Sequence, residues 1–139
     1  MKNPLRLTNL SIGIIVVILF AITGQLMRHY YHNAEAADVE RLYRRSRHLL
    51  LLLSGLMQGG IGIYIQAHKH KLPNTLQWVA TALMTIGSLS LIYAFFYEIP
   101  QAIIKTPISR LGMYILLASG VLHLVSSALN HYQSKSNPT

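Results

Sequence analysis

Residues 72–97 read LPNTLQWVATALMTIGSLSLIYAFFY, a long stretch without any Asp, Glu, Lys or Arg. Three further stretches share this property: 7–27, 49–67 and 111–122, the last of which resumes after His123 and runs to Asn130. Each can supply the ~20 predominantly apolar residues that a helix needs to cross a bilayer. A soluble core in a chain of 139 residues has no room for four such segments. The sequence therefore predicts an all-α integral membrane protein with four helices.

The composition supports the same conclusion. Hydrophobic residues make up 52% of the chain and charged residues only 12%, against roughly 25% charged residues in soluble domains. The net charge is +8, and the basic residues lie mainly at the ends of the uncharged stretches, where they would meet lipid phosphates. This placement predicts the lipid bilayer as a partner and no nucleic acid. Because the chain has no cysteine, disulfides and thiolate-bound metals are excluded.

Prolines and polar connections mark where the helices should begin and end. Pro73, Pro100 and Pro107 interrupt the apolar pattern between helices. The sequence thus predicts one transmembrane domain over 1–139, with helices at about 8–28, 47–67, 75–97 and 109–131. The hydrophilic connection 29–46 contains the opposite-sign pairs Asp38–Arg41 and Glu40–Arg44 at helical spacing. They predict a helix there, either short and interfacial or continuous with the second transmembrane helix. Connections this short favour an antiparallel bundle.

Four arginines stand immediately before the second predicted helix: Arg41, Arg44, Arg45 and Arg47. We expect this cluster to contact lipid headgroups and to resist translocation, which would leave the loop 29–46 in the cytoplasm and both termini outside. The first apolar stretch is longer than the ~7–15 residues of a signal-peptide core, so it is interpreted as a retained helix. Together these features predict a multi-pass protein of the bacterial inner membrane.

Glycines cluster on one face of the second predicted helix. Gly55 and Gly59 form a Gly-x-x-x-Gly pair, and Gly62 follows at helical spacing. Such a face lets a neighbouring helix backbone approach closely, as small residues do in membrane helix pairs. We therefore expect Gly55, Gly59 and Gly62 to lie at a helix–helix contact, with a side chain at Gly59 causing a clash.

A few polar residues fall near the middle of the predicted spans. His123 lies only ~5 Å from the midpoint of its helix at ~1.5 Å rise per residue, and similar depths are predicted for Gln58, Thr85, Ser88 and Ser119. An ionisable residue inside a membrane can mark a proton relay or a ligand site. Polar and small residues also hold membrane helices together without further function. Both interpretations of this five-residue cluster stay open from the sequence.

No catalytic, metal or nucleotide motif stands out, so the leading hypothesis is a non-enzymatic accessory or assembly subunit without a cofactor. Its partner would be another membrane protein or a second copy in a homo-oligomer. The alternative is a small transporter or proton-linked carrier centred on His123. Small four-helix drug exporters are similar in length and helix number but depend on an acidic residue in the first helix, which 7–27 lacks. A haem- or metal-binding redox protein comes third, because bis-His haem needs a second imidazole at the depth of His123.

Overall fold

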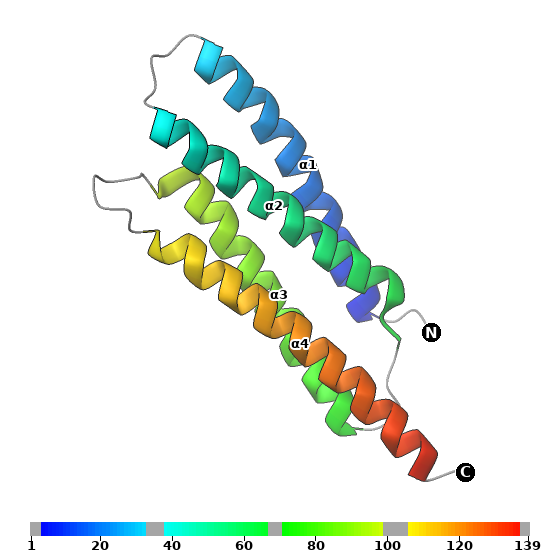
Figure 1. Cartoon of the computed structure of the whole chain (residues 1–139). Coiled ribbons are helices and arrows are strands. Elements are labelled where there is room, and N and C mark those ends of the chain that lie inside the picture. The colour runs from blue at the N-terminus through cyan, green and yellow to red at the C-terminus, as the bar shows by residue number, and fades with distance from the viewer. Residues whose placement is uncertain (1–3, 33–37, 67–70, 99–105, 137–139) are drawn as a thin grey trace.

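The computed structural model describes residues 4–32, 38–66, 71–98 and 106–136. These residues form four helices, α1 (Pro4–His32), α2 (Asp38–Tyr64), α3 (Lys71–Tyr97) and α4 (Pro107–Ser136), and no strand. Consecutive helices run in opposite directions, so that the start of α1 and the end of α4 lie at the same end of the molecule (Figure 1). The prediction of an all-α protein with four helices packed together is confirmed.

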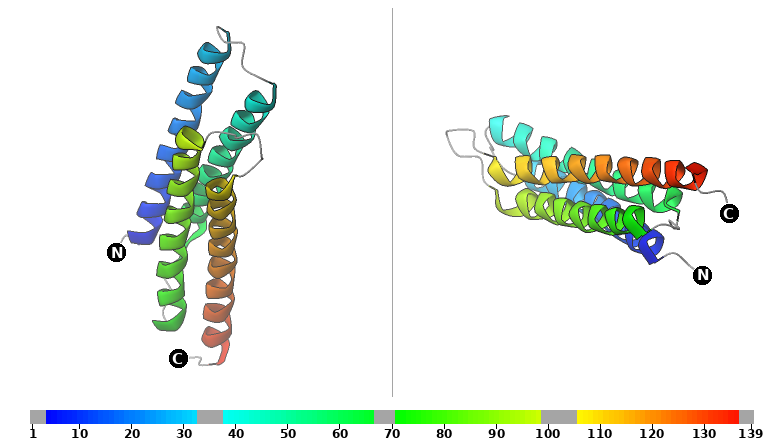
Figure 2. Two further views of the ribbon diagram at one scale, coloured as in Figure 1. Left: turned by 90° about the vertical axis from the view of Figure 1, so that its left-hand side faces the viewer. Right: turned by 90° about the horizontal axis from the view of Figure 1, so that it is seen from below.

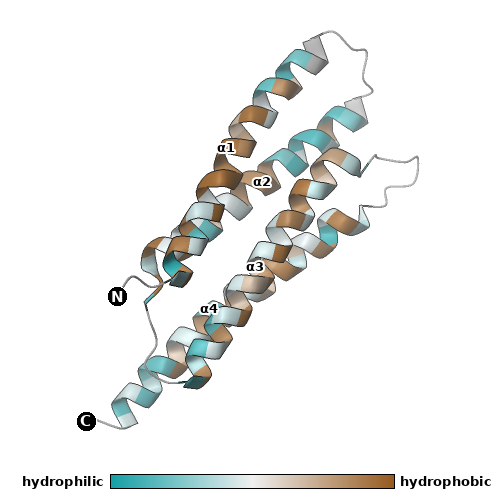
Figure 3. Ribbon diagram, turned by 180° about the vertical axis from the view of Figure 1, so that it is seen from behind, coloured by the Kyte–Doolittle hydropathy of each residue, from teal (hydrophilic) through white to brown (hydrophobic). Residues whose placement is uncertain are grey.

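The helices are longer than the apolar stretches on which their prediction rested. α2 begins at Asp38, so residues 38–46 of the hydrophilic connection are helical and continue into the apolar part (Figure 3). α3 begins at Lys71 rather than near 75, with Pro73 in its first turn. The first turn has no intrahelical acceptors for its N–H groups, so a proline there loses no hydrogen bond. Pro4 and Pro107 open α1 and α4 for the same reason.

Three of the described helices are long and apolar enough to cross a membrane: the segments Pro4–His29, Lys71–Tyr97 and Pro107–Ser136. α2, with 27 residues, is long enough but not apolar enough to be among them, although four spans were expected. The physical reason is its sequence, in which an arginine-rich first third precedes the apolar residues, and Gln58 and four glycines dilute the remainder. α2 nevertheless lies within the bundle beside α1 and α3 (Figure 2).

The bundle consists of two closely packed helical hairpins, α1–α2 and α3–α4, which contact each other mainly through α2 and α3. Glycines permit the close approach within each hairpin. A Cβ atom on Gly13 of α1 would lie only 2.5 Å from the backbone N of Gly59 in α2, and one on Gly62 would lie 2.6 Å from the backbone N of Leu10. In the other hairpin, a Cβ on Gly87 would lie 3.1 Å from the carbonyl oxygen of Gly112.

The expected clash at Gly59 itself is wrong. A Cβ atom on Gly59 would meet nothing within 4 Å, whereas one on Gly55 would lie 2.9 Å from Val17 Cγ2. The backbone of Gly59 lies against Gly13, but a Cβ atom on Gly59 would point away from this contact. The glycine that requires its lack of a side chain at this contact is therefore Gly13, which the sequence analysis did not single out.

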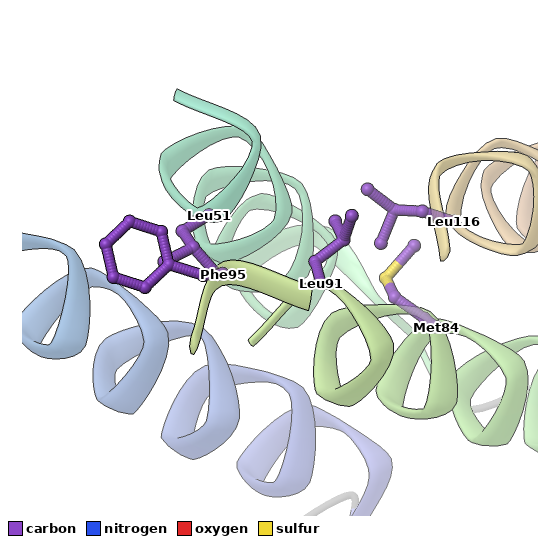
Figure 4. Close-up of a cluster of buried hydrophobic side chains, with 5 residues drawn as sticks. All are labelled: Leu51, Met84, Leu91, Phe95 and Leu116. Carbon is purple, nitrogen blue, oxygen red and sulfur yellow. The ribbon is translucent and has the colours of Figure 1, made fainter. Parts of the chain in front are cut away.

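A small hydrophobic cluster joins the two hairpins. It consists of Leu51 from α2, Met84, Leu91 and Phe95 from α3, and Leu116 from α4 (Figure 4). Met27 of α1 packs against its edge but stays partly exposed. The hydrophobic core is thus built around α3, and α1 is attached to the bundle mainly through its contact with α2.

Candidate functional site

Three members of the predicted polar cluster are in direct contact. Gln58 is fully buried on α2. Its Nε2 donates a hydrogen bond to Thr85 Oγ1 (3.2 Å), and its Oε1 accepts one from Ser88 Oγ (2.9 Å). Both partners lie on α3, so the amide of Gln58 ties one hairpin to the other. A buried amide without partners would be costly, and these hydrogen bonds offset that cost.

His123 joins this arrangement through Thr81 rather than through Gln58. Thr81 Oγ1 lies 3.5 Å from His123 Nε2 of α4 and accepts a hydrogen bond from Asn9 Nδ2 of α1 (3.2 Å). The carbonyl oxygen of Thr81 accepts a hydrogen bond from the Thr85 hydroxyl (3.0 Å). Thr81 is therefore the junction of one polar network that reaches all four helices: Asn9 on α1, Gln58 on α2, Thr81, Thr85 and Ser88 on α3, and His123 on α4.

Ser119 lies outside this network. Its hydroxyl donates to the carbonyl oxygen of Leu116 within α4 at 2.6 Å, which satisfies the buried hydroxyl locally. Ser126, by contrast, donates to the carbonyl oxygen of Pro73 in the first turn of α3 at 2.7 Å. Asn9 and Ser126 were missed by the sequence analysis. An amide two residues into an apolar stretch is the signal that could have found Asn9, because such a group needs a partner in a membrane.

A second polar cluster lies where α3 ends and α4 begins. Arg47 of α2 is only 5% exposed. Its Nη2 lies 3.5 Å from Glu98 Oε2, and its Nη1 donates to the carbonyl oxygens of Glu98 and Ala94. Arg47 was expected to contact lipid headgroups together with its neighbours; unlike an exposed headgroup contact, its side chain is buried and paired with Glu98. It points into the bundle at the level of the last turn of α3, where it contacts Ala94 and Glu98.

The carboxylate of Glu98 also caps α4. Oε1 accepts the backbone N–H of Ile108 at 2.9 Å, and Oε2 accepts the N–H of Ser109 at 3.2 Å and the Ser109 hydroxyl. A carboxylate here satisfies the free donors of the first helical turn and complements the helix dipole. Glu98 thus links the end of α3, the start of α4 and the guanidinium of Arg47.

The other three arginines of the predicted headgroup cluster differ in exposure. Arg44 is partly buried and pairs with Glu40 one turn earlier, with 2.9 Å between Nη2 and Oε1. Arg41 is also partly buried, and Arg45 is exposed. The positions of Arg41, Arg44 and Arg45 at the charged start of α2 leave the headgroup prediction open for them.

Pockets open on the sides of the bundle between the described residues, three of which bear on the candidate site. One of about 190 Å³ is lined by His123, Gln77 and Tyr64 among others, and one of about 250 Å³ lies beside Arg47 and Arg110. A third, of about 300 Å³, is lined mainly by apolar side chains such as Phe95 and Phe96. Within the described ranges, no group of three or more His, Cys, Asp or Glu side chains is placed to hold a metal ion.

Comparison of the chain with protein-family models, with curated proteins and with solved structures finds no match.

Proposed function

We propose that this chain is a multi-pass integral membrane protein of the bacterial inner membrane that works as a non-enzymatic accessory or assembly subunit. One observation carries the membrane part of the proposal. Among the described residues, thirteen polar or charged side chains are buried against nine hydrophobic ones, while large apolar side chains are exposed along all four helices. Water-soluble proteins bury apolar side chains preferentially and seldom expose large apolar patches. A surrounding bilayer makes this distribution favourable.

The polar network supports a structural role for the buried groups. Helices in a membrane gain no hydrophobic stabilisation from meeting each other, so small residues and interhelical hydrogen bonds hold them together. The Gly13–Gly59 and Gly87–Gly112 contacts and the network through Thr81 supply both kinds of interaction. The buried polar groups of this network thus have a role in assembly of the bundle that requires no catalysis.

The subunit part of the proposal rests on α1. In the most apolar part of α1 only 17% of the residues are buried inside the bundle, against 44% in the corresponding part of α3. The uncovered face carries a row of exposed side chains: Ile14, Ile15, Ile18, Ile22 and Leu26. A helix that its own chain covers so little offers an apolar surface for a second membrane protein or a second copy of this chain.

Site-specific crosslinking in native membranes tests this proposal. A photoreactive residue at Ile18 on α1 should give a discrete protein adduct, because this face is proposed to meet the partner. The same residue at Val121 on α4 is a matched control, since the two side chains are 52% and 58% exposed, and it should label lipid only. Extraction of the chain by an alkaline carbonate wash would contradict membrane residence. Retention in the membrane without an adduct at Ile18 or Ile22 would contradict the subunit role.

A transporter centred on His123 is the second candidate, and the pocket beside His123 is the observation that favours it. His123→Gln keeps a hydrogen-bonding side chain but cannot titrate, whereas His123→Leu removes both properties. For a structural histidine, Gln should restore the stability that Leu loses and leave function intact. A folded Gln variant that loses proton-coupled flux in proteoliposomes would favour the transporter. Absorbance of the purified protein near the Soret region tests the haem hypothesis separately.

A further inference from the structure

The pocket between the first half of α2 and the start of α4 has an unusual lining. Its volume is about 250 Å³. Two arginines line it, Arg47 and Arg110, and four hydroxyl-bearing residues accompany them: Tyr43, Ser46, Thr106 and Ser109. Leu50 and Met113 complete the wall. Two cationic residues and four hydroxyl-bearing residues thus border a space that also has an apolar side.

Two of the three guanidinium nitrogens of Arg47 donate no hydrogen bond to the described residues. A guanidinium carries five N–H donors, and Nη1 of Arg47 serves the carbonyl oxygens of Glu98 and Ala94. Nε and Nη2 are buried and donate no hydrogen bond. The ion pair with Glu98 compensates Arg47 only in part, since the Glu98 carboxylate already accepts three hydrogen bonds from Ile108 and Ser109.

The charge around the pocket favours an anion. Arg47 and Arg110 contribute two positive charges, and Glu98 contributes one negative charge that is held at the start of α4. Arg110 is exposed, so its guanidinium can contact a ligand directly. Arg47 is buried behind the pocket surface and contributes its positive charge. Arginine guanidinium groups bind phosphate through paired charge-assisted hydrogen bonds, and hydroxyls add further donors.

We propose that this pocket binds a phosphate group, presented by an anionic phospholipid headgroup. The proposal rests on the membrane residence proposed above. The pocket then lies near the bilayer surface, because it adjoins the end of α3 and the start of α4, and Leu50 and Met113 face the apolar part of the same lipid. Inorganic phosphate offers the same chemistry without the apolar part, and the experiment separates the two sources.

The experiment measures thermal unfolding of the full chain in neutral detergent by the loss of helical circular dichroism. Phosphatidylglycerol, phosphatidylcholine or inorganic phosphate is added in turn, since a ligand of the folded state raises the unfolding temperature. We expect phosphatidylglycerol to stabilise the wild type more than phosphatidylcholine does. Arg110→Gln should weaken the apparent affinity about tenfold, the loss expected for one charge-assisted hydrogen bond. Arg45→Gln removes an exposed arginine of α2 outside the pocket and should change the affinity less than twofold.

Arg47 needs a paired variant, because replacing it alone would leave Glu98 buried without its partner. Arg47→Gln combined with Glu98→Gln removes both charges, and it should also lose the preference for phosphatidylglycerol. Stabilisation by inorganic phosphate that depends on Arg110 would support the site with a soluble ligand. Equal responses of Arg110→Gln and Arg45→Gln, or equal binding of both lipids, would overturn the proposal. If the chain then still resists a carbonate wash, membrane residence stands and only the phosphate site fails.

Discussion

The contact between Gly13 and Gly59 leads to a specific prediction, because a side chain would be tolerated on one of these glycines and not on the other. In Gly13→Ala, the new Cβ atom would lie 2.5 Å from Gly59 N and 2.8 Å from Gly59 Cα. Relief to ordinary contact at 3.4 Å requires a shift of about 0.9 Å, and the atoms concerned are helix backbone, which cannot rotate away. Overpacking of this kind costs about 1–3 kcal/mol, and the helix propensity of alanine returns at most about 1 kcal/mol. Subtracting the full gain leaves about 0–2 kcal/mol, and we expect the upper half of this range, about 1–2 kcal/mol, because the contacted atoms are helix backbone.

Gly59→Ala is the matched control for this loss. It makes the same chemical change on the opposite side of the same contact, but its Cβ atom would meet nothing within 4 Å. The variant should therefore be as stable as the wild type or slightly more stable through helix propensity. Unfolding in mixed detergent micelles, followed by circular dichroism, compares the two. If Gly13→Ala retains wild-type stability, or if Gly59→Ala is the more damaging change, the helices do not meet as described.

Further predictions concern the polar contacts and the topology. Glu98→Gln should destabilise the bundle by about 3 kcal/mol, the usual cost of breaking a buried ion pair, and adding Arg47→Gln should recover part of the loss in the same unfolding assay. Ser88→Ala should lower the free energy of unfolding by about 0.6 kcal/mol, the average for interhelical hydrogen bonds in membranes. Ser119→Ala should lower it less, because the Ser119 hydrogen bond stays within α4. Equal losses for the two variants would contradict this distinction. Reporters inserted between α1 and α2 and after α4 should lie on opposite sides of the membrane, and detection of both on one side would remove a span.

The number and order of the helices could be predicted from the sequence because long uncharged stretches and prolines are local signals. The bounds were harder to predict. Pro73 indicated a break, yet it lies in the first turn of α3, where its missing N–H has no consequence. The charged segment before Arg47 was predicted to be helical from its opposite-sign pairs, and it is the first part of α2. The error at Pro73 has a physical origin: proline breaks a helix interior, whereas in the first turn it removes no backbone hydrogen bond.

The candidate site shows a different limit. Depth in the membrane follows from position along a helix, so Gln58, Thr85 and Ser88 could be placed at one level, and they are in contact. The facing direction of each helix depends on its neighbours. Ser119 therefore bonds within α4, and His123 reaches the network through Thr81. Likewise, the sequence indicated a glycine face on α2 but not that Gly13 of α1 would meet it.

Close glycine contacts and buried polar contacts occur at different places in the bundle. The glycine contacts with the backbone of a neighbouring helix lie within each hairpin, where connected helices meet with little loss of chain entropy. Between the hairpins, Arg47, Gln58 and Asn9 each form a polar contact with α3 or its last turn, alongside the cluster around Leu51. In the bilayer proposed above, lipid would give no hydrophobic reason for the hairpins to associate, whereas hydrogen bonds require particular partners. We therefore expect these polar groups to set the register in which the hairpins dock, which would be a structural reason to bury so many of them.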